Sequence, residues 1–296
     1  IALREEGIGG RVLVLGGLQA AEELALAARH DLEVTIHDPV QLAWLEQARP
    51  ALAVKVWLKI DTGMTRLGFP PEAVQDVHAR LVAAAAVAGP PGLMTHLACA
   101  DELDSLMTPR QVETFTACTA GLSGERSVAN SAGILGAWGI QADWIRPGLA
   151  LYGLSPFADR VGRDHDLRPV MTLSARIIAR RSVPAGSTVG YGAAHRCVER
   201  TSIAIVAVGY ADGYPRRATG QLPITLRDRR TSTLGRVSMD LTVVDAGPWP
   251  EARVGDEVEL WGPGLPAEAV AAAVPCIPYE LVAGLGSRVA YQYHGG

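Results

Sequence analysis

The sequence predicts an α/β protein with a (β/α)8 TIM-like barrel as its first domain and a mainly β second domain. The chain has 296 residues, which corresponds to about two domains. Short β-branched runs alternate with helical stretches up to about residue 160, as in a parallel sheet built from βα units. From residue 170 onward the runs are β-branched or alternating, and Pro and Gly turns separate them. We therefore expect one domain over residues 1–160 and another over residues 161–296.

The first domain contains six runs that we expect to be strands, with helix signals between them. Asp38–Gln41 and Thr108–Gln111 each combine an N-cap residue, a proline at the first helical position and a capping-box glutamine. Ala73–Ala88 predicts a further helix, which Gly89 and Pro90 end. The expected strands are Arg11–Leu15, Glu33–His37, Lys55–Ile60, Leu93–His96, Ser127–Ala129 and Trp144–Arg146.

The number of strands is two short of a closed barrel. A βα barrel closes with eight strands, and the chain opens on IALREEGIGG, which resembles the end of a helix. We expect that the first two βα units are absent from the chain; an open sheet of six strands is the alternative. In the second domain we expect strands within MTLSARIIARRSV, TSIAIVAVGYADG, TSTLGRVSMDLTVVDAG and GDEVELWG, and one short helix over Ala267–Ala273.

Composition and charge exclude several classes of protein. Hydrophobic residues make up 48% and charged residues 20%, which is typical of a globular chain and not of a disordered or fibrous one. The net charge of -4 and the pI near 6.0 argue against a nucleic-acid partner. No run reaches the roughly 18 apolar residues of a membrane span. The four cysteines, Cys99, Cys118, Cys197 and Cys276, have no metal-binding spacing. We expect a cytoplasmic protein that binds neither metal nor membrane.

Polar residues follow the expected strands of the first domain, at the end where a βα barrel has its active site. Phosphate sites in barrels frequently form after the seventh and eighth strands. If two strands are absent, the strands ending at Ala129 and Arg146 take those places, so a phosphorylated ligand is plausible near Ser131 and Gly148. The candidate residues are Asp61, Thr62, Gly63, Arg66, His96, Asn130, Ser131, Arg146 and Gly148.

Each candidate also has a purely structural interpretation. A histidine such as His96 is more often a hydrogen-bonded core residue, and Asn130-Ser131 is more often a helix cap. Arg66 and Arg146 are also read as exposed ion-pair residues of little energetic value. The segment GYADGYP, taken alone, is a turn between strands. Individually, these signals are weak.

Seven segments taken together and in order resemble alanine racemase, a family of pyridoxal-phosphate enzymes. The resemblance implies a cofactor-binding barrel, a C-terminal β domain and a homodimer whose active sites are shared between the subunits. It also implies the interconversion of L- and D-alanine, with proton removal on one face of Cα and delivery on the other. The segments are KIDTGMTRLG (Lys59–Gly68), THLACAD (Thr95–Asp101), ANSAG (Ala129–Gly133), WIRPGLALYG (Trp144–Gly153), VGYGAAH (Val189–His195), GYADGYPRR (Gly209–Arg217) and GRVSMDLTVVD (Gly235–Asp245).

The resemblance also implies the roles of individual residues. Arg146 faces the pyridine nitrogen, and a guanidinium that keeps its proton leaves this nitrogen unprotonated, which disfavours transamination. The phosphate is held by Ser131, the backbone of Gly148 and Leu149 and the hydroxyl of Tyr279, with Asn130 beside the cofactor. Tyr191 is the base on one face, in the partner's active site, and His96 and Arg146 tune its pKa. Arg66 binds the substrate carboxylate or the phenolic oxygen of the cofactor, and Lys59 is the position of a carbamylated lysine. The N–H of Met239 binds the carboxylate, and Tyr210 lines the entrance of the site.

The chain departs from the family in two places. Ser127 stands where many relatives have a histidine that supports the arginine. The second departure is the Schiff-base lysine, which in the family is the acid–base group on the other face of Cα and lies within a segment resembling VVKANAYGHG. The only lysines here are Lys55, expected at the far end of the barrel, and Lys59. We therefore expect the Schiff-base lysine in the absent N-terminal segment. The alternatives are a broader-specificity amino-acid racemase of the same fold and a non-catalytic, truncated relative that binds the cofactor.

Overall fold

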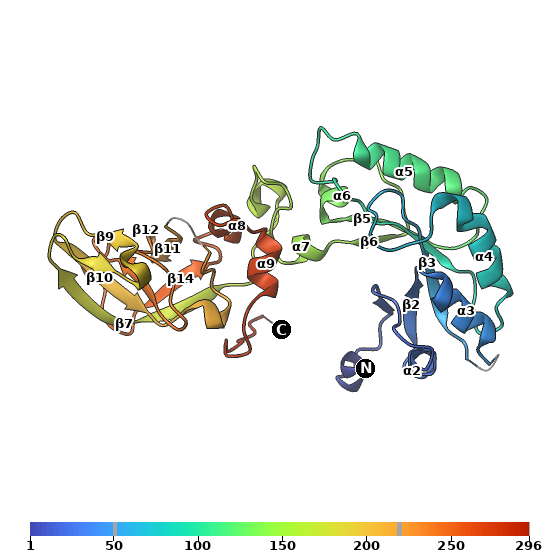
Figure 1. Cartoon of the computed structure of the whole chain (residues 1–296), viewed down its shortest axis with the longest axis horizontal. Helices are drawn as coiled ribbons and strands as arrows, with labels where there is room; N and C mark the ends of the chain where they lie inside the picture. The colour runs from blue at the N-terminus through green and yellow to red at the C-terminus, as the bar shows by residue number, and fades with distance from the viewer. Residues whose placement is uncertain (50–51, 218–220, 296) are drawn as a thin grey trace. The chain divides into compact units, whose positions relative to one another are not determined.

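A six-stranded parallel sheet forms the core of the first of two units, Ile1–Pro147 and Gly148–Gly296, into which the chain divides. The computed structural model describes residues 1–49, 52–217 and 221–295. The strands follow one another in the sheet in the order of the sequence (Figure 1). They are β1 (Val12–Val14), β2 (Leu32–Ile36), β3 (Lys55–Lys59), β4 (Gly92–Met94), β5 (Arg126–Asn130) and β6 (Trp144–Arg146). All six predicted strands are confirmed, with ends shifted by at most two residues.

Helices alternate with these strands, and α3, α4 and α5 lie around the outside of the sheet in Figure 1. The predicted start of α3 is confirmed, because the Asp38 side chain accepts a hydrogen bond of 2.9 Å from the N–H of Val40 and Pro39 is the first helical residue. The helices of this unit are α1 (Ala2–Glu5), α2 (Glu23–Arg29), α3 (Pro39–Gln47), α4 (Val74–Ala83), α5 (Met107–Cys118) and α6 (Ser131–Leu135), with a short 3-10 turn, η1 (Pro71–Ala73), before α4. None of the helices in the described ranges is both long enough and apolar enough to cross a membrane.

Two of the predicted helix boundaries are wrong. Helix α5 begins at Met107, with Leu106 at the N-cap position, and Thr108 is buried inside the helix. Helix α4 ends at Ala83, five residues before the predicted end. The chain after Ala83 pairs with Val54, whose N–H donates to the carbonyl of Ala86 at 2.9 Å. This pairing with a distant strand competes with the helix, although alanine favours helix locally.

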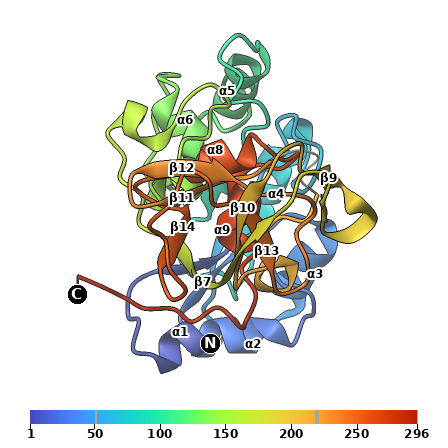
Figure 2. The same ribbon diagram turned by 90° about the vertical axis from the view of Figure 1, so that its left-hand side faces the viewer.

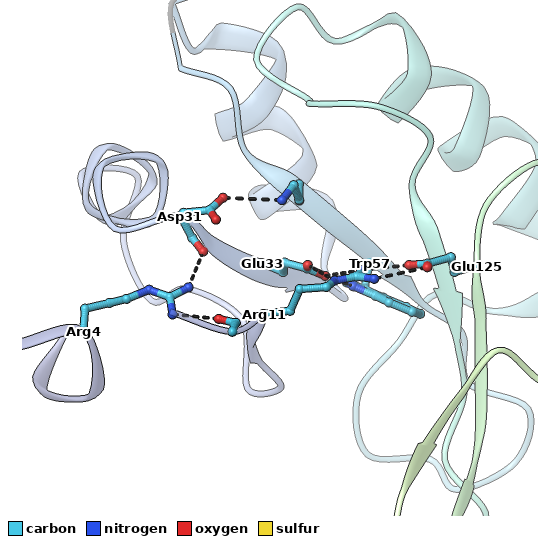
Figure 3. Close-up of polar contacts among 8 residues, drawn as sticks. Arg4, Arg11, Asp31, Glu33, Trp57 and Glu125 are labelled. Carbon is cyan, nitrogen blue, oxygen red and sulfur yellow. Dashed lines mark hydrogen bonds and ion pairs between the residues drawn. The ribbon is translucent and has the colours of Figure 1, made fainter. Parts of the chain in front are cut away.

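The parallel sheet is open, and its edge strands are β1 and β6. Figure 3 shows the polar network at its amino end, where Arg11 contacts both Glu33 and Glu125. The guanidinium of Arg11 also lies 4.4 Å from the ring centroid of Trp144, so the starts of the two edge strands face each other and the sheet is strongly curled. Burial raises the pKa of Glu33, but hydrogen bonds from Arg11 and Trp57 outweigh it and hold this pKa below its usual value.

The second unit is built on a six-stranded antiparallel sheet in the order β12-β11-β14-β7-β10-β13, whose strands are labelled in Figure 2. Its core includes Ile177, Val206, Val258 and Trp261, which are at most 1% exposed. The strands are β7 (Leu173–Val183), β10 (Thr201–Val206), β11 (Pro223–Leu226), β12 (Arg229–Ser232), β13 (Thr242–Asp245) and β14 (Glu257–Trp261), beside a separate ribbon of β8 (Thr188–Val189) and β9 (His195–Arg196). The predicted β character of this half is confirmed.

The helices of this unit include two, α7 (Gly148–Leu151) and α9 (Pro278–Ala283), that the sequence did not predict. We predicted one short helix over Ala267–Ala273, and α8 covers Ala267–Ala271. Helix α9 carries Tyr279 and begins with a proline at its first position. That proline was the available signal. The unit also contains the 3-10 turns η2 (Gly162–His165), η3 (Tyr191–Ala193) and η4 (Tyr210–Asp212).

Candidate functional site

Predicted site residues of the first unit gather at the carboxyl ends of its strands. Lys59 ends β3, His96 follows β4, and Arg146 ends β6. Nη2 of Arg146 lies 3.3 Å from Nδ1 of His96. Lys59 is only 8% exposed, and its charge and that of Arg66 both act on His96. The sheet therefore brings three predicted residues together, because parallel strands all end at the same edge.

Arg146 is held by a set of oxygen atoms around its guanidinium. Nη2 donates to the carbonyl of Thr95 at 2.5 Å and to that of Val128 at 3.2 Å, and Nη1 donates to the hydroxyl of Ser127. Burial lowers the pKa of Arg146 to about 10, which still leaves the guanidinium protonated at neutral pH. Ser127, where we noted a departure from the family, thus supports Arg146 directly.

His96 is a neutral imidazole in this environment. Its pKa is lowered to about 4, first by burial and then by the charges of Arg146, Lys59 and Arg66. Because a guanidinium only donates hydrogen bonds, Nδ1 of His96 accepts from Arg146, and the ring proton is on Nε2. The residue is half-buried and hydrogen-bonded to Arg146, another predicted site residue, and its role in the site stays a prediction.

We expect the substitution His96→Asn to make the free energy of unfolding less dependent on pH. A histidine has a pKa near 6.5 in the unfolded chain, whereas that of His96 is about 4 in the folded protein. Between these values the unfolded state binds more protons, so the wild type loses stability as the pH falls. The loss attributable to His96 is about 2 kcal/mol at pH 5 relative to pH 7.5.

Urea unfolding of both proteins at these two pH values measures this difference. His37, whose pKa is also lowered, is present in both proteins and cancels in the comparison. An equal loss of stability in wild type and variant would show that His96 is not held neutral by its surroundings.

The loop after β3 carries Arg66 beside a buried lysine. One oxygen of Asp61 accepts hydrogen bonds of 2.9 Å from the N–H groups of Gly63 and Thr65, which folds the loop back on itself. Arg66 is exposed on this loop. Burial, followed by the charges of Arg66 and Arg146, lowers the pKa of Lys59, which favours a neutral and nucleophilic amine.

Two residues of this region were not identified as site candidates from the sequence. His37 follows β2 at the same edge of the sheet, and its Nδ1 is buried without a partner among residues 1–49, 52–217 and 221–295. Its position after a strand was the signal. The side chain of Gln111 donates to the carbonyl of His96 at 2.9 Å and accepts from the N–H of Ala98 at 2.8 Å. We predicted Gln111 as a capping residue, but it fixes the loop that carries His96.

Asn130 and Ser131 form the start of α6. Oδ1 of Asn130 accepts a hydrogen bond of 2.9 Å from the N–H of Gly133, so the helix-cap interpretation of Asn130 is confirmed. Ser131 is 3% exposed, and its hydroxyl donates to the carbonyl of Pro147. The roles of these two residues toward a cofactor stay predictions.

In the second unit, Tyr279 lies against the backbone of Gly148 and Leu149. The N–H of Leu149 donates to the hydroxyl of Tyr279. A Cβ atom at residue 148 would lie 2.1 Å from that hydroxyl oxygen, so a side chain there would displace Tyr279. Three predicted phosphate ligands are thus in contact, with a hydroxyl and a backbone N–H at one point.

The remaining predicted residues of the second unit form a second group. The guanidinium of Arg216 lies 5.0 Å from the ring centroid of Tyr210 and 5.9 Å from that of Tyr191. The N–H of Ala211 donates to the carbonyl of Met239 at 3.0 Å. Tyr191 is 63% exposed, Tyr210 37% and Met239 53%. The structure therefore brings together the predicted base, the predicted entrance residue and the predicted carboxylate contact, and leaves all three accessible.

The described part of the chain contains no group of three His, Cys, Asp or Glu residues that could hold a metal ion.

Comparison with family models matches residues 1–156 to the N-terminal domain of alanine racemase. Residues 170–293 match the C-terminal domain of alanine racemase. The two matches cover the residues discussed above.

Two alanine racemases illustrate the similarity of the sequence. The enzyme of Halorhodospira halophila (strain DSM 244 / SL1) is 47% identical over 290 residues, which is 97% of this chain and 79% of the relative. That of Aliivibrio salmonicida (strain LFI1238) is 46% identical over 293 residues, 99% of this chain and 82% of the relative.

Solved structures show the same similarity of fold. The biosynthetic alanine racemase of Pseudomonas aeruginosa superposes with a TM-score of 0.94 at 41% identity, over 99% of this chain and 82% of that one. The alanine racemase of Bartonella henselae, whose structure contains covalently bound pyridoxal phosphate, has a TM-score of 0.84 at 26% identity, over 97% of this chain and 80% of that one.

Proposed function

Because the chain belongs to the alanine racemase family, we propose that it interconverts L-alanine and D-alanine with pyridoxal phosphate as its cofactor. The observation that carries this function is the identity of 46–47% to alanine racemases over nearly the whole chain. The reaction moves a proton from one face of Cα to the other, which requires two acid–base groups. A direct test is turnover of each enantiomer by the purified protein, with lysine and arginine as alternative substrates to measure its breadth.

The residues of this chain fit the cofactor. When bound, pyridoxal phosphate withdraws electrons from Cα and makes its proton acidic. We propose that Arg146 donates a hydrogen bond to the pyridine nitrogen. With a pKa of about 10, its guanidinium keeps its proton at neutral pH and cannot protonate this nitrogen. The oxygens of Thr95, Val128 and Ser127 hold the guanidinium in place for this role.

The proposed phosphate ligands come from two parts of the chain. One is the start of α6, where Ser131 supplies a hydroxyl and Asn130 lies beside it. The other is the backbone of Gly148 and Leu149 with the hydroxyl of Tyr279, at the point that a Cβ on residue 148 would fill. Hydroxyls and backbone N–H groups are the usual ligands of a phosphate at such a place.

Tyr191 is the proposed acid–base group on one face of Cα. Its exposure on the second unit supports a role in the active site of the partner subunit, and hence a homodimer with shared sites. His96, neutral and bonded to Arg146, is proposed to tune this tyrosine through a hydrogen-bond relay. Met239 is proposed to bind the substrate carboxylate through its N–H, at an entrance lined by Tyr210.

Lys59 is proposed to be carbamylated. The neutral amine attacks the carbon of CO₂, a C–N bond forms as one C–O π bond opens, and an amine proton is released. A carbamate anion then stands where a protonated lysine would carry a positive charge. Burial, followed by the positive charges of Arg66 and Arg146, lowers the pKa of Lys59, and the negative charge of Asp61 acts in the opposite direction. The lowered pKa supplies the neutral amine. The carbamate would pair with Arg66 and hold it for the substrate carboxylate or the phenolic oxygen of the cofactor.

We expect that neither lysine of the chain binds the cofactor covalently. Lys55 begins β3, at the opposite end of the strand from the site, and its Nζ lies 3.4 Å from Asp31. Borohydride reduction of the protein with pyridoxal phosphate, followed by peptide mapping, should leave Lys55 and Lys59 unlabelled. A pyridoxyl group on Lys59 would contradict its proposed carbamylation.

A further inference from the structure

One arginine near the end of the chain bridges two loops of the second unit. Nη2 of Arg288 lies 2.9 Å from Oδ1 of Asp212, and Nη1 lies 2.8 Å from Oδ1 of Asp240. Asp212 ends the turn η4, which carries Tyr210, and Asp240 directly follows Met239. A single guanidinium therefore joins the loop of the proposed entrance residue to the loop of the proposed carboxylate-binding N–H.

Backbone contacts show how closely these loops fit. The N–H of Tyr210 donates to the carbonyl of Ser238 at 3.1 Å, and that of Ala211 donates to Met239 at 3.0 Å. A Cβ on residue 209 would lie 2.2 Å from the carbonyl oxygen of Met239, so glycine is required at Gly209. The N–H of Met239 has no hydrogen-bond partner within the described ranges, which leaves it available to a carboxylate.

Asp212 connects the turn to the C-terminal segment as well. Its Oδ2 accepts a hydrogen bond of 2.9 Å from the N–H of Gly209, which closes the turn. Its carbonyl accepts another of 2.9 Å from the N–H of Gly286. The C-terminal segment is thus bonded to the turn through its backbone and to both loops through Arg288.

The planar guanidinium suits this bridge, because it presents separate nitrogen atoms to two carboxylates in a fixed geometry. The side chains are exposed by 51% for Arg288 and 56% for Asp240, and exposed ion pairs add little to global stability. The effect of the Arg288 bridge is therefore local, on the two loops that it joins. Without Arg288, the carboxylates of Asp212 and Asp240 on the two loops would lose their shared cation, and their negative charge would disfavour the binding of a carboxylate at these loops.

We propose that Arg288 is a positioning residue for the substrate carboxylate. It fixes the Met239 loop against the Tyr210 turn and neutralises Asp212 and Asp240, so that a carboxylate binds at the N–H of Met239. This inference rests on the proposed function of Met239.

The test compares wild type with Arg288→Ala, Arg288→Lys and Arg229→Ala. Arg229 is the matched control, since it is an exposed arginine of the same unit whose guanidinium lies 3.4 Å from Glu251. The ligand probe is propanoate, which is alanine without its amino group and tests carboxylate binding alone. Hydrogen exchange of the Tyr210 and Ala211 amides reports on the loops in the protein without cofactor.

We expect Arg288→Ala to raise the KM for alanine and the inhibition constant of propanoate by the same factor, about tenfold. The kcat should change by less than about twofold, and the two amides should exchange faster. Arg288→Lys should lie between Arg288→Ala and wild type in each measurement, and Arg229→Ala should equal wild type.

Faster exchange with unchanged propanoate binding would overturn the proposal, because the loops would then be held without effect on the ligand. Unchanged exchange and binding would also overturn it, as would an equal effect from Arg229→Ala. A wild-type protein that racemises neither enantiomer would refute the proposed function separately. Propanoate binding and amide exchange would still decide the role of Arg288.

Discussion

Tyr191→Phe is expected to lower the racemisation of both enantiomers by about a thousandfold, because it removes the proposed acid–base group from one face of Cα. The side chain is 63% exposed, and the aromatic ring beside Arg216 is retained, so the fold should be unaffected. L- and D-alanine have equal free energies in solution, so kcat/KM must fall equally in both directions. A kinetic assay alone therefore does not show which face has lost its base.

Exchange of the α-hydrogen in deuterated water resolves the two faces. In the variant, one enantiomer should still exchange its α-hydrogen without inversion, because the substitution does not change the second acid–base group that the proposed reaction requires on the opposite face. The other enantiomer should lose exchange and inversion together. Tyr210→Phe is the matched control, since its ring contacts the same guanidinium, and its turnover should fall by less than about tenfold. Loss of exchange in both enantiomers of the Tyr191 variant would refute a role on one face.

Arg146→Glu is expected to reduce racemisation by roughly a hundredfold and to raise the formation of pyruvate from alanine. The guanidinium, with its pKa of about 10, donates a hydrogen bond and keeps its proton at neutral pH. A glutamic acid at the same position would instead transfer a proton to the pyridine nitrogen. A protonated pyridine nitrogen withdraws electrons more strongly, which favours transfer of the amino group over simple return of the proton.

Arg146→Gln separates this electronic effect from the loss of hydrogen bonds. Both substitutions remove the guanidinium that donates to the carbonyls of Thr95 and Val128, so both should destabilise the protein. Only the glutamate has a proton that it can share with the nitrogen. Pyruvate formation should therefore rise in the Glu variant and not in the Gln variant. An equal rise in both would show that disorder of the site, and not its acidity, causes the side reaction.

Local patterns predicted the strands well, because β-branched runs and the helix signals that separate them are read directly from neighbouring residues. The start of α3 was predicted for the same reason, since Asp38 bonds to Val40, two residues away. The start of α5 was not. Thr108 and Gln111 have the spacing of a cap, but Gln111 bonds across the fold to the loop of His96. Tertiary contacts of this kind override a local signal.

In the candidate site, too, some features follow from the sequence and others depend on tertiary contacts. The positions of Lys59, His96 and Arg146 at strand ends follow from the topology, so their gathering at one edge could be expected. The pairing of Arg288 could not, because its partners are 48 and 76 residues away in the sequence. His37 was overlooked although it occupies an equivalent position. Its lowered pKa depends first on burial, and only the structure reveals that burial.

The scarcity of lysine has a consequence for a protein that handles a reactive aldehyde. Pyridoxal phosphate condenses with any neutral amine that it meets. Of the two ε-amines in this chain, Lys59 is 8% exposed and buried among arginines, and the side chain of Lys55 is 48% exposed beside Asp31. The 25 arginines carry the rest of the positive charge, and a guanidinium does not form such adducts under these conditions. The chain therefore offers the free aldehyde few ε-amines with which to form unproductive adducts.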